Sequence, residues 1–393
     1  MQSLIQSPTA PDFVQNPYPF YERARALGPF FHWQDYDLIC TPSAAAANAI
    51  FRDRRFGREV PPEMAKPIAP HTAPFYAVEA HSMLELEPPR HTRLRSLVLR
   101  AFTSRRIANL HGDIESLSHR LIDALPDSDF DLITGFAQPL PVIIIARLLG
   151  VPEAMAGQLL HWSNAMVGMY QARRTHAMEV AASDAARDFS DFLRGYVEER
   201  RKAPADDLIT QLIAAESEGE RLSTDELITT CILLLNAGHE ATVHTLGNGV
   251  KTLLETGTVA QILRPETAPK VVEEILRFDP ALHMFTRTAY ETVEVMGHTF
   301  QRGDQVGLLL GATNRDPQLW ERPDAFWPER TDKPNLTFGA GLHFCVGAPL
   351  ARLELQIALP ILFRRMPDLR LAEPPRYADV YHFHGLERLQ LTR

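Results

Sequence analysis

The chain has few cysteines, no long apolar run and no excess of positive charge. Its 393 residues include three cysteines, Cys40, Cys231 and Cys345, which excludes a disulfide framework and indicates a reducing compartment. The formal net charge of −9 argues against a nucleic-acid-binding protein. No apolar stretch reaches the ~18 residues of a membrane-spanning helix, and the segment 1–8 lacks the pattern of a secretory signal. We therefore expect a soluble, cytoplasmic protein without a membrane anchor.

No repeat, low-complexity tract or linker divides the chain, so residues 1–393 are expected to form one domain. Helical periodicity dominates, and strand-like alternation is confined to short pieces, so the expected fold class is mainly α with small β-sheets (α+β). The expected helices are Ser104–Leu125, Leu140–Leu149, Glu153–Tyr170, Ala177–Lys202, Thr224–Glu255 and Ala348–Leu362. The expected strands are Phe30–Leu38, Thr292–Phe300 and Gln305–Leu310.

The longest of these helices, Thr224–Glu255, begins with a capping-box pattern. Ser223 and Glu226 can cap each other's backbone, and a nearly continuous apolar run follows. About 30 helical residues span about 45 Å, so the helix is expected to pass through the core. The segment Ala237–Thr242 is polar and contains a glycine, both of which cost stability in a buried helix. We expect the helix to be locally loosened there.

The segment Phe338–Gly347 is the most informative part of the sequence. It places Cys345 on a glycine-rich loop directly before the helix expected at Ala348–Leu362. Backbone N–H groups and the positive end of a helix lower the pKa of a thiol, so a thiolate is expected. A lone cysteine is most often a buried structural thiol, and that interpretation stays open at this point.

Several other roles for this loop are weaker. Gly339 and Gly341 lack the third glycine of a dinucleotide-binding fingerprint, because Phe344 stands in its place. A zinc site would need further cysteines nearby. A nucleophilic cysteine would need a base, and His343 is too close in sequence to be assigned that role. Ligation of haem iron by a single thiolate remains.

The central helix also carries a motif similar to that of zinc proteases. His239 and His244 flank Glu240, but they are five residues apart and therefore roughly 140° apart around a helix. Two histidines in that arrangement cannot share a zinc ion, so a metal-dependent hydrolase is not supported.

Two further pairs are ambiguous when they are taken alone. Glu274 and Arg277 are spaced to share a helix face, and so are His91 and Arg95. Most such pairs lie on the protein surface and contribute little to stability.

Together, these features resemble the cytochrome P450 monooxygenases, specifically the soluble bacterial type. The resemblance extends over essentially the whole chain, and Phe338–Gly347 matches the family's cysteine loop at every fixed position. Glu274 and Arg277 match the family's ExxR pair, and Arg330 matches the third member of a buried trio that acts as a folding lock. The resemblance implies the cytochrome P450 fold, with a long central helix over the haem.

The resemblance assigns Cys345 as the axial ligand of haem b (iron protoporphyrin IX), where a thiolate helps to cleave the O–O bond of dioxygen. It places the two haem propionates among several donors, which buried carboxylates require. The cofactor-binding residues that it implies are His91, Arg95, Arg287, His343, Phe338, Gly339 and Ala237.

The oxygen-binding segment departs from the family pattern at one position. Ala237, Gly238 and Glu240 align with it, but alanine (Ala241) follows the acid where most members have threonine. The hydroxyl of Thr242 would lie about 100° further round the helix. Three outcomes stay open: a substrate hydroxyl or an ordered water completes the proton relay, Thr242 does so through a distorted helix, or oxygen activation is poorly coupled. We favour the first, and because Glu240 is present we do not expect a dedicated peroxygenase.

The resemblance also implies a substrate pocket and separate redox partners. Most of the pocket residues are apolar, so a hydrophobic small molecule is the expected substrate. They are Phe75, Tyr76, Met166, Met169, Tyr170, Leu233, Ala237, Leu282, His283, Met284, Phe285, His382 and Phe383, of which the two histidines could anchor a polar end.

No flavin or iron–sulfur segment follows the cysteine loop, so we expect no fused reductase. Electrons are then expected from a ferredoxin and its NAD(P)H-dependent reductase, with the enzyme as a monomer. The arginines proposed to dock the ferredoxin are Arg93, Arg100, Arg352 and Arg364. The alternative function is a non-catalytic haem-thiolate sensor or binding protein, which would share the cysteine loop but need no substrate pocket.

Overall fold

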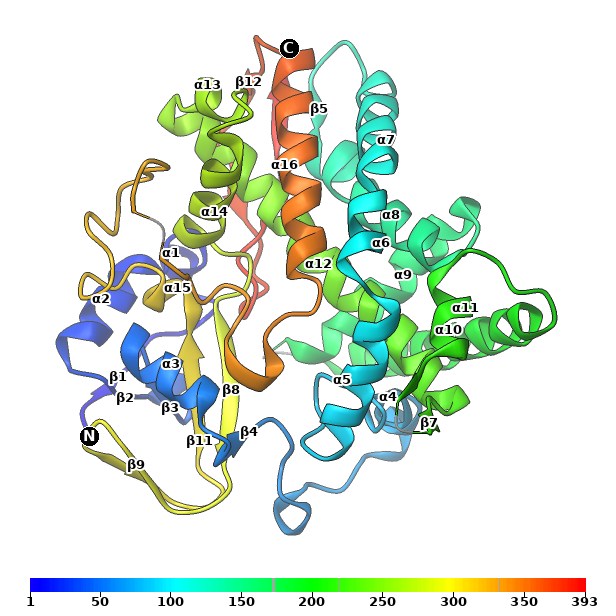
Figure 1. Ribbon diagram of the computed structural model, residues 1–393. Helices are drawn as coiled ribbons and strands as arrows, with labels where there is room; N and C mark the ends of the chain where they lie inside the picture. Colours follow the sequence, from blue (N-terminus) through cyan, green and yellow to red (C-terminus); the bar gives the residue numbers. More distant parts are fainter. Residues whose placement is uncertain (172–173, 218, 332) are drawn as a thin grey trace.

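A largely helical region packs against a six-stranded sheet in the computed structural model, which describes residues 1–171, 174–217, 219–331 and 333–393 (Figure 1). The expected fold class, mainly α with small β-sheets, is confirmed. In Figure 1 the sheet lies at the lower left, and the helices α5 to α11 form the right-hand side. The helices are α1 Pro11–Gln15, α2 Tyr18–Ala26, α3 Ala44–Arg52, α4 Ala73–Glu79, α5 Arg90–Ala101, α6 Ser104–Asn109, α7 His111–Asp123, α8 Pro139–Leu149, α9 Ala156–Val167, α10 His176–Lys202, α11 Leu208–Ala214, α12 Thr224–Thr256, α13 Val259–Ile262, α14 Ala268–Phe278, α15 Leu310–Thr313 and α16 Ala348–Arg365.

The large sheet joins strands of the N-terminal region to two strands within residues 284–309. Its strand order is β1-β2-β3-β11-β8-β4, and β11 pairs parallel to β3 and antiparallel to β8. The strands are β1 Ser3–Leu4, β2 Phe31–Trp33, β3 Leu38–Thr41, β4 Phe56–Gly57, β8 Met284–Ala289 and β11 Gln305–Leu309. Smaller pairings are made by β9 Val293–Val295 with β10 His298–Phe300, by β15 Gln390–Thr392 with β5 Phe130–Asp131 and β12 Arg370–Leu371, by β13 Arg376–Tyr377 with β14 Leu386–Arg388, and by β6 Glu216–Ser217 with β7 Glu220–Arg221.

Several predicted elements are divided by turns in the structure. The strand expected at Phe30–Leu38 is a hairpin of β2 and β3, because Asp37 adopts a left-handed conformation with φ of 46°. The strand expected at Thr292–Phe300 is likewise a hairpin, turning at Met296 and Gly297 with φ of 47° and 80°. The helix expected at Ser104–Leu125 is broken at Leu110 into α6 and α7.

Strand β8 was not predicted, and it changes the interpretation of residues 282–285. Successive side chains of a strand point to opposite faces. Met284 accordingly packs among the aromatic residues of the N-terminal region, whereas Phe285 contacts the guanidinium of Arg58 on the other face. The prediction that the whole run faces one pocket is therefore wrong for Met284.

The central helix α12 is confirmed from its capping box onward. The Ser223 side chain accepts the N–H of Glu226, and the Glu226 side chain accepts the N–H of Ser223. The helix packs against α8, α9, α10, α14 and α16, and it is continuous over Thr224–Thr256. The predicted loosening at Ala237–Thr242 is therefore not observed. The hydroxyl of Thr242 donates to the Gly238 carbonyl at 2.8 Å, a local bond that buries the polar side chain without interrupting the helix.

Within the described ranges, no helix combines the length and the hydropathy that crossing a lipid bilayer requires.

One acidic residue is buried in α16, the helix that follows the cysteine loop. The Glu354 side chain is 1% exposed, and its Oε1 atom has no hydrogen-bond partner within the described part of the chain. Burial raises the pKa of Glu354 to about 8, because a carboxylate loses its hydration there. Since the pKa of an unfolded glutamate is about 4.3, the folded protein holds one more proton than the unfolded chain between these pH values.

We predict that Glu354→Gln flattens the pH dependence of stability. The proton that Glu354 retains makes the free energy of unfolding fall by about 1.4 kcal/mol per pH unit as pH rises from about 4.3 toward 8, and the amide removes this contribution. Denaturant unfolding at several pH values measures it. Glu387→Gln, at an exposed position of β14, should leave the slope unchanged; equal slopes in both variants would contradict the prediction.

Candidate functional site

The cysteine loop is closed by backbone bonds and shaped by its glycines. The N–H of Cys345 donates to the Phe338 carbonyl at 3.0 Å, which joins the ends of the loop. Gly339 and Gly341 have positive φ angles of 68° and 69°. A Cβ on Gly341 would lie 2.2 Å from the backbone oxygen of Phe51, so only glycine fits there. The loop therefore presents Cys345 directly before α16.

The environment of the Cys345 thiol differs from the expectation in one respect. The backbone N–H groups of Gly347 and Ala348 point at its sulfur, and the charges of Arg95 and Arg352 lie nearby, all of which favour the thiolate. Burial nevertheless outweighs them and raises the pKa of Cys345. These N–H groups and charges act on the thiol in the predicted direction, and burial acts against them. A cation bound to the sulfur would supply the missing stabilisation, since a metal deprotonates a coordinating thiol.

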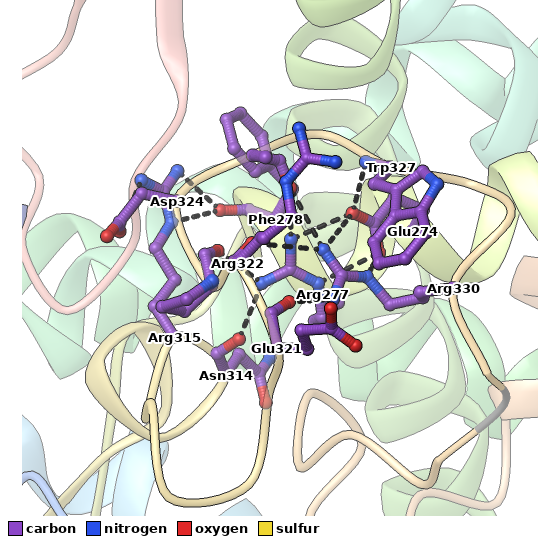
Figure 2. A network of polar contacts seen from close by, with 12 residues as sticks. Glu274, Arg277, Phe278, Asn314, Arg315, Glu321, Arg322, Asp324, Trp327 and Arg330 are labelled. Atoms are coloured by element: carbon purple, nitrogen blue, oxygen red, sulfur yellow. Dashed lines mark hydrogen bonds and ion pairs between the residues drawn. The ribbon is translucent and has the colours of Figure 1, made fainter.

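The structure brings Glu274, Arg277 and Arg330 together in the core. Both guanidiniums pair with the Glu274 carboxylate: Arg277 at 2.8 Å through Nε and Nη2, and Arg330 at 2.8 Å and 3.1 Å (Figure 2). The side chains of Glu274 and Arg277 are 2% and 1% exposed, so this is a buried ion pair and not a surface pair. The N–H of Trp327 donates to the same carboxylate at 2.7 Å.

A chain of hydrogen bonds links this trio to the cysteine loop. Arg277 donates to the Asn314 carbonyl at 2.8 Å, and the Asn314 side chain donates to the hydroxyl of Thr337 at 2.7 Å. Thr337 in turn donates to the Leu276 carbonyl at 2.6 Å, beside Arg277 in α14. Because Thr337 directly precedes Phe338, the buried trio positions the first residue of the cysteine loop.

The four expected propionate donors lie in one region. The rings of His91, in α5, and His343, in the cysteine loop, are 4.4 Å apart between centroids. Arg95, one turn after His91, donates to the Phe344 carbonyl at 2.7 Å. Arg287, in β8, is buried, and burial together with the charge of Arg58 lowers its pKa to about 10.

Sequence reasoning missed Glu87 and Arg58 in this region. Glu87 Oε1 accepts both the Arg58 backbone N–H at 2.8 Å and His343 Nε2 at 2.9 Å. A Cβ on Gly57 would lie 2.5 Å from the same oxygen, so that glycine allows the close approach. Arg58 is partly buried and pairs with Glu85. A glycine followed by an arginine in a loop is too weak a signal to have identified them.

The residues present fit a haem group. Both ring nitrogens of the buried His91 lack a hydrogen-bond partner among the residues described, and so does Nε of Arg58. The partly buried Arg58 and the buried Arg287 bring two guanidiniums into this region, which suits a pair of carboxylates. Cys345 provides a single thiolate ligand on the same side of the molecule, with Arg95 as the residue common to both groups.

A strip of accessible side chains lies in the middle of α12. Ala237 is exposed, and Leu233 and Ala241, one turn to either side, are partly exposed, although most residues of this helix are buried. Gly238 lies toward α8, where a Cβ would be 2.9 Å from Ile145, so helix packing alone favours glycine there.

The acid of this segment is paired with a histidine of the next turn. Glu240 Oε1 lies 3.0 Å from His244 Nε2. Burial raises the pKa of Glu240, but this hydrogen bond and the charges of His244 and His239 act more strongly, so that the pKa is lowered. His244 sits against Gly385, where a Cβ would clash with its ring at 1.8 Å. The acid is therefore held by His244 and not by Thr242.

Most of the expected pocket residues come together beside α12. Phe75 contacts the rings of Tyr76 and Tyr170 at 5.4 Å and 6.1 Å between centroids. The sulfur of Met166 accepts a weak hydrogen bond from the side-chain amide of Asn236 in α12 at 3.6 Å. Met169 and Leu233 belong to the same hydrophobic cluster. On the other side, Leu282 pairs with Phe383, whose ring is 5.8 Å from that of His244.

The two histidines expected to anchor a substrate lie elsewhere. His283 is fully buried, and its Nδ1 atom is 2.8 Å from the hydroxyl of Tyr21. His382 packs against the rings of Tyr36 and Tyr381. The polar groups near the pocket residues are instead Glu79, which accepts the Tyr170 hydroxyl at 3.0 Å, and the Arg58–Glu85 pair. Burial and the charge of Glu85 raise the pKa of Glu79 to about 8.

The arginines expected to dock a redox partner are not equivalent. Arg93 pairs with Glu226 and Glu220, and Arg352 pairs with Glu273. Arg100 and Arg364 are exposed. Arg100 lies in α5, the helix that contains His91, and Arg364 lies in α16, the helix that follows Cys345.

Comparison with known proteins gives a consistent result. A family model described as Cytochrome P450 matches residues 175–367. The chain is 35% identical to "Polyketide biosynthesis cytochrome P450 PksS" of Bacillus subtilis (strain 168), covering 100% of this chain and 99% of that one. It is also 35% identical to "Cytochrome P450 monooxygenase PikC" of Streptomyces venezuelae, over 93% of this chain and 87% of the relative. The crystal structure of P450BioI in complex with hexadec-9Z-enoic acid ligated acyl carrier protein superposes with a TM-score of 0.91 at 34% identity, covering 97% and 99% of the two chains.

We predict that Glu274→Gln destabilises the protein by about 3–5 kcal/mol, because it leaves two buried guanidiniums without a counter-charge. Denaturant unfolding measures the loss; failure of the variant to accumulate as folded protein is the extreme of the same result. Glu273→Gln is the matched control, since its partner Arg352 and Glu273 itself are 31% and 38% exposed. The control should cost no more than about 1 kcal/mol. Similar losses of stability in the two variants would show that the buried trio contributes no more to stability than the exposed Glu273–Arg352 pair.

Proposed function

This chain is a cytochrome P450 monooxygenase, and we propose that it inserts one oxygen atom of O2 into a hydrophobic small molecule. The observation that carries the proposal is Cys345, presented on its loop near the buried His91 and the partly exposed Arg95. Haem held by a thiolate supplies the activation of dioxygen. We assign haem b as the cofactor and residues 1–393 as one haem domain.

In this proposal, each residue of the cofactor region has a distinct task. Cys345 would bind the iron, with the N–H groups of Gly347 and Ala348 stabilising its sulfur as a thiolate. Arg287 would neutralise the charge of the buried carboxylates, and His91 would donate a hydrogen bond to them. His343 is held in place by Glu87 at 2.9 Å, so it would contribute orientation as well as charge.

Protons are proposed to reach the distal face through Glu240 and His244. Their 3.0 Å contact provides a donor and an acceptor one helical turn apart. The Thr242 hydroxyl is occupied by the Gly238 carbonyl at 2.8 Å, which disfavours it as a substitute for the missing threonine. We therefore propose that a hydroxyl of the substrate, or an ordered water, completes the relay beside Ala241.

The printed names of two relatives suggest where to look for the substrate. PksS is named for polyketide biosynthesis, and P450BioI was crystallised with a fatty acyl group on an acyl carrier protein. Phe75, Met166, Met169 and Leu233 provide an apolar lining suited to such chains. Long-chain acyl and polyketide compounds, free and attached to a carrier protein, are thus the first to test.

Electrons are proposed to come from a separate ferredoxin and its NAD(P)H-dependent reductase. Arg100, in the last turn of α5, and Arg364, in the last turn of α16, are exposed and could attract an acidic partner. The alternative is a haem-thiolate sensor, which would bind ligands but would not consume NAD(P)H or release a hydroxylated product.

We predict that the reduced, carbon-monoxide-bound protein shows the strongly red-shifted Soret band of a haem thiolate. Cys345→Ala should abolish this band, whereas Cys40→Ala, at a buried position in β3, should retain it. A band at the position of an imidazole-ligated haem in the unaltered protein would overturn the assignment.

We predict that Ala241→Thr leaves the coupling of NAD(P)H consumption to product formation unchanged or lower with the true substrate, because the hydroxyl is already supplied from outside the chain. Coupling is measured as product formed per NAD(P)H consumed, with hydrogen peroxide determined in parallel. A large rise in coupling would refute substrate assistance and favour the poorly coupled alternative.

A further inference from the structure

His71, His176 and Glu179 meet at one point on the surface. His71 lies in the short 3-10 helix η3 (Pro70–Thr72) that leads into α4, and His176 is the first residue of α10, with Glu179 one turn later. His71 Nε2 lies 2.7 Å from Glu179 Oε2, and the rings of the two histidines are 4.4 Å apart between centroids. One ligand atom from each residue lies within 4.8 Å of the others.

This trio has the chemistry of a metal site with an open position. Two imidazoles and one carboxylate are ligands that zinc accepts, with water completing a tetrahedral site. The spacing of three residues places His176 and Glu179 on the same face of α10. The side chains of His71 and Glu179 are 30% and 21% exposed, so an ion can reach them from solvent while the ligands remain partly ordered by packing.

Arg174 leaves one carboxylate oxygen available. Its Nε donates to Glu179 Oε1 at 2.8 Å, and the same side chain donates to the Met169 carbonyl at 3.3 Å. Glu179 Oε2 faces His71 and not Arg174. A hydrogen bond to the non-coordinating oxygen is a common way to orient a ligating carboxylate. The positive charge of Arg174 opposes the ion, so the binding energy must come from the three direct ligands.

We propose that His71, His176 and Glu179 bind a divalent transition-metal ion of the zinc class. The ion replaces the hydrogen bond between His71 and Glu179 with coordinate bonds to both. It then fastens η3 and α4 to the start of α10, two segments that are distant in sequence and in contact in the fold. Since α4 carries Phe75 and Tyr76, metal binding would restrain residues expected to contact the substrate.

A second cluster of similar composition is a useful contrast. Asp279, His283 and His384 also lie within 4.8 Å of one another, but all three are fully buried. The Asp279 carboxylate already accepts the hydroxyls of Tyr18 at 2.7 Å and Tyr377 at 2.5 Å. The Asp279 oxygens already accept hydrogen bonds within the protein, so that cluster is a structural polar network. The ligand atoms of the surface trio, in contrast, are accessible to an ion from solvent.

Zinc affinity of the haem-loaded, untagged protein tests the proposal. After treatment with EDTA and desalting, Zn²⁺ is titrated in competition with a chromophoric chelator. We expect one ion per chain at the tightest site. His71→Ala and His176→Ala should each lower the zinc affinity by at least roughly 10-fold, the loss typical even for residues that only hydrogen-bond to a metal ligand. Glu179→Gln should act similarly, since it keeps the size of the side chain but loses its charge.

His32→Ala is the matched control. His32 also pairs with a carboxylate, Asp37 at 3.0 Å, but belongs to no such trio in the part of the chain that the structure describes. It should leave zinc affinity unchanged. If the His71 and His176 variants bind zinc as tightly as the unaltered protein, the site is refuted.

Hydrogen exchange tests the fastening separately. Zinc should slow amide exchange in segments 70–80 and 176–182 of the unaltered protein, and it should have no such effect in His71→Ala. If zinc binds to the trio but gives no such protection, the proposed restraint of α4 is wrong. The carbon-monoxide spectrum should be the same in all variants, which keeps this test independent of the proposed function.

Discussion

The buried carboxylate of Glu274 is the interaction on which the rest of the structure depends. It accepts two guanidiniums and a backbone N–H in a region that water does not reach. Arg277 and Arg330 use their remaining donors on backbone carbonyls of residues 314–325, which fixes the course of an irregular segment with few regular hydrogen bonds of its own. Through Asn314 and Thr337 the same network reaches the cysteine loop. A buried charge is costly unless every partner is in place, so this arrangement holds in one geometry or not at all.

The cofactor region follows the same principle with a different balance. Hydrogen-bond donors outnumber the acids available to them: Arg58 has Glu85 and His343 has Glu87, while His91 and Arg287 are buried without a comparable partner among the described residues. Burial raises the pKa of Cys345 despite the donors that surround it. One ligand would satisfy both regions. The carboxylates of an iron-bearing dicarboxylate would accept the unpaired donors, and its iron would stabilise Cys345 as a thiolate.

Much of the fold could be anticipated from local patterns. The capping box and apolar run of α12, and the helix that follows Cys345, are strong local signals, and the structure has both. Strand β8 was missed because its residues pair with β11 and β4, which lie elsewhere in the chain, and no local periodicity marks them. The expected loosening of α12 failed for a related reason: the cost of Gly238 is offset by its packing against Ile145, a contact made only in the folded protein.

The cysteine loop, the Glu274–Arg277 pair with Arg330, and the family that they indicate could all be recognised from the sequence, because they depend on residue types in recognisable patterns. Which polar groups contact one another is visible only in the folded protein. In the folded protein His283 contacts Tyr21, and Glu240 pairs with His244. Glu87 contacts His343, and His71 pairs with Glu179 of α10, more than one hundred residues further along the chain. Partners of this kind depend on burial and on how distant segments pack, and neither is written in the local pattern of the chain.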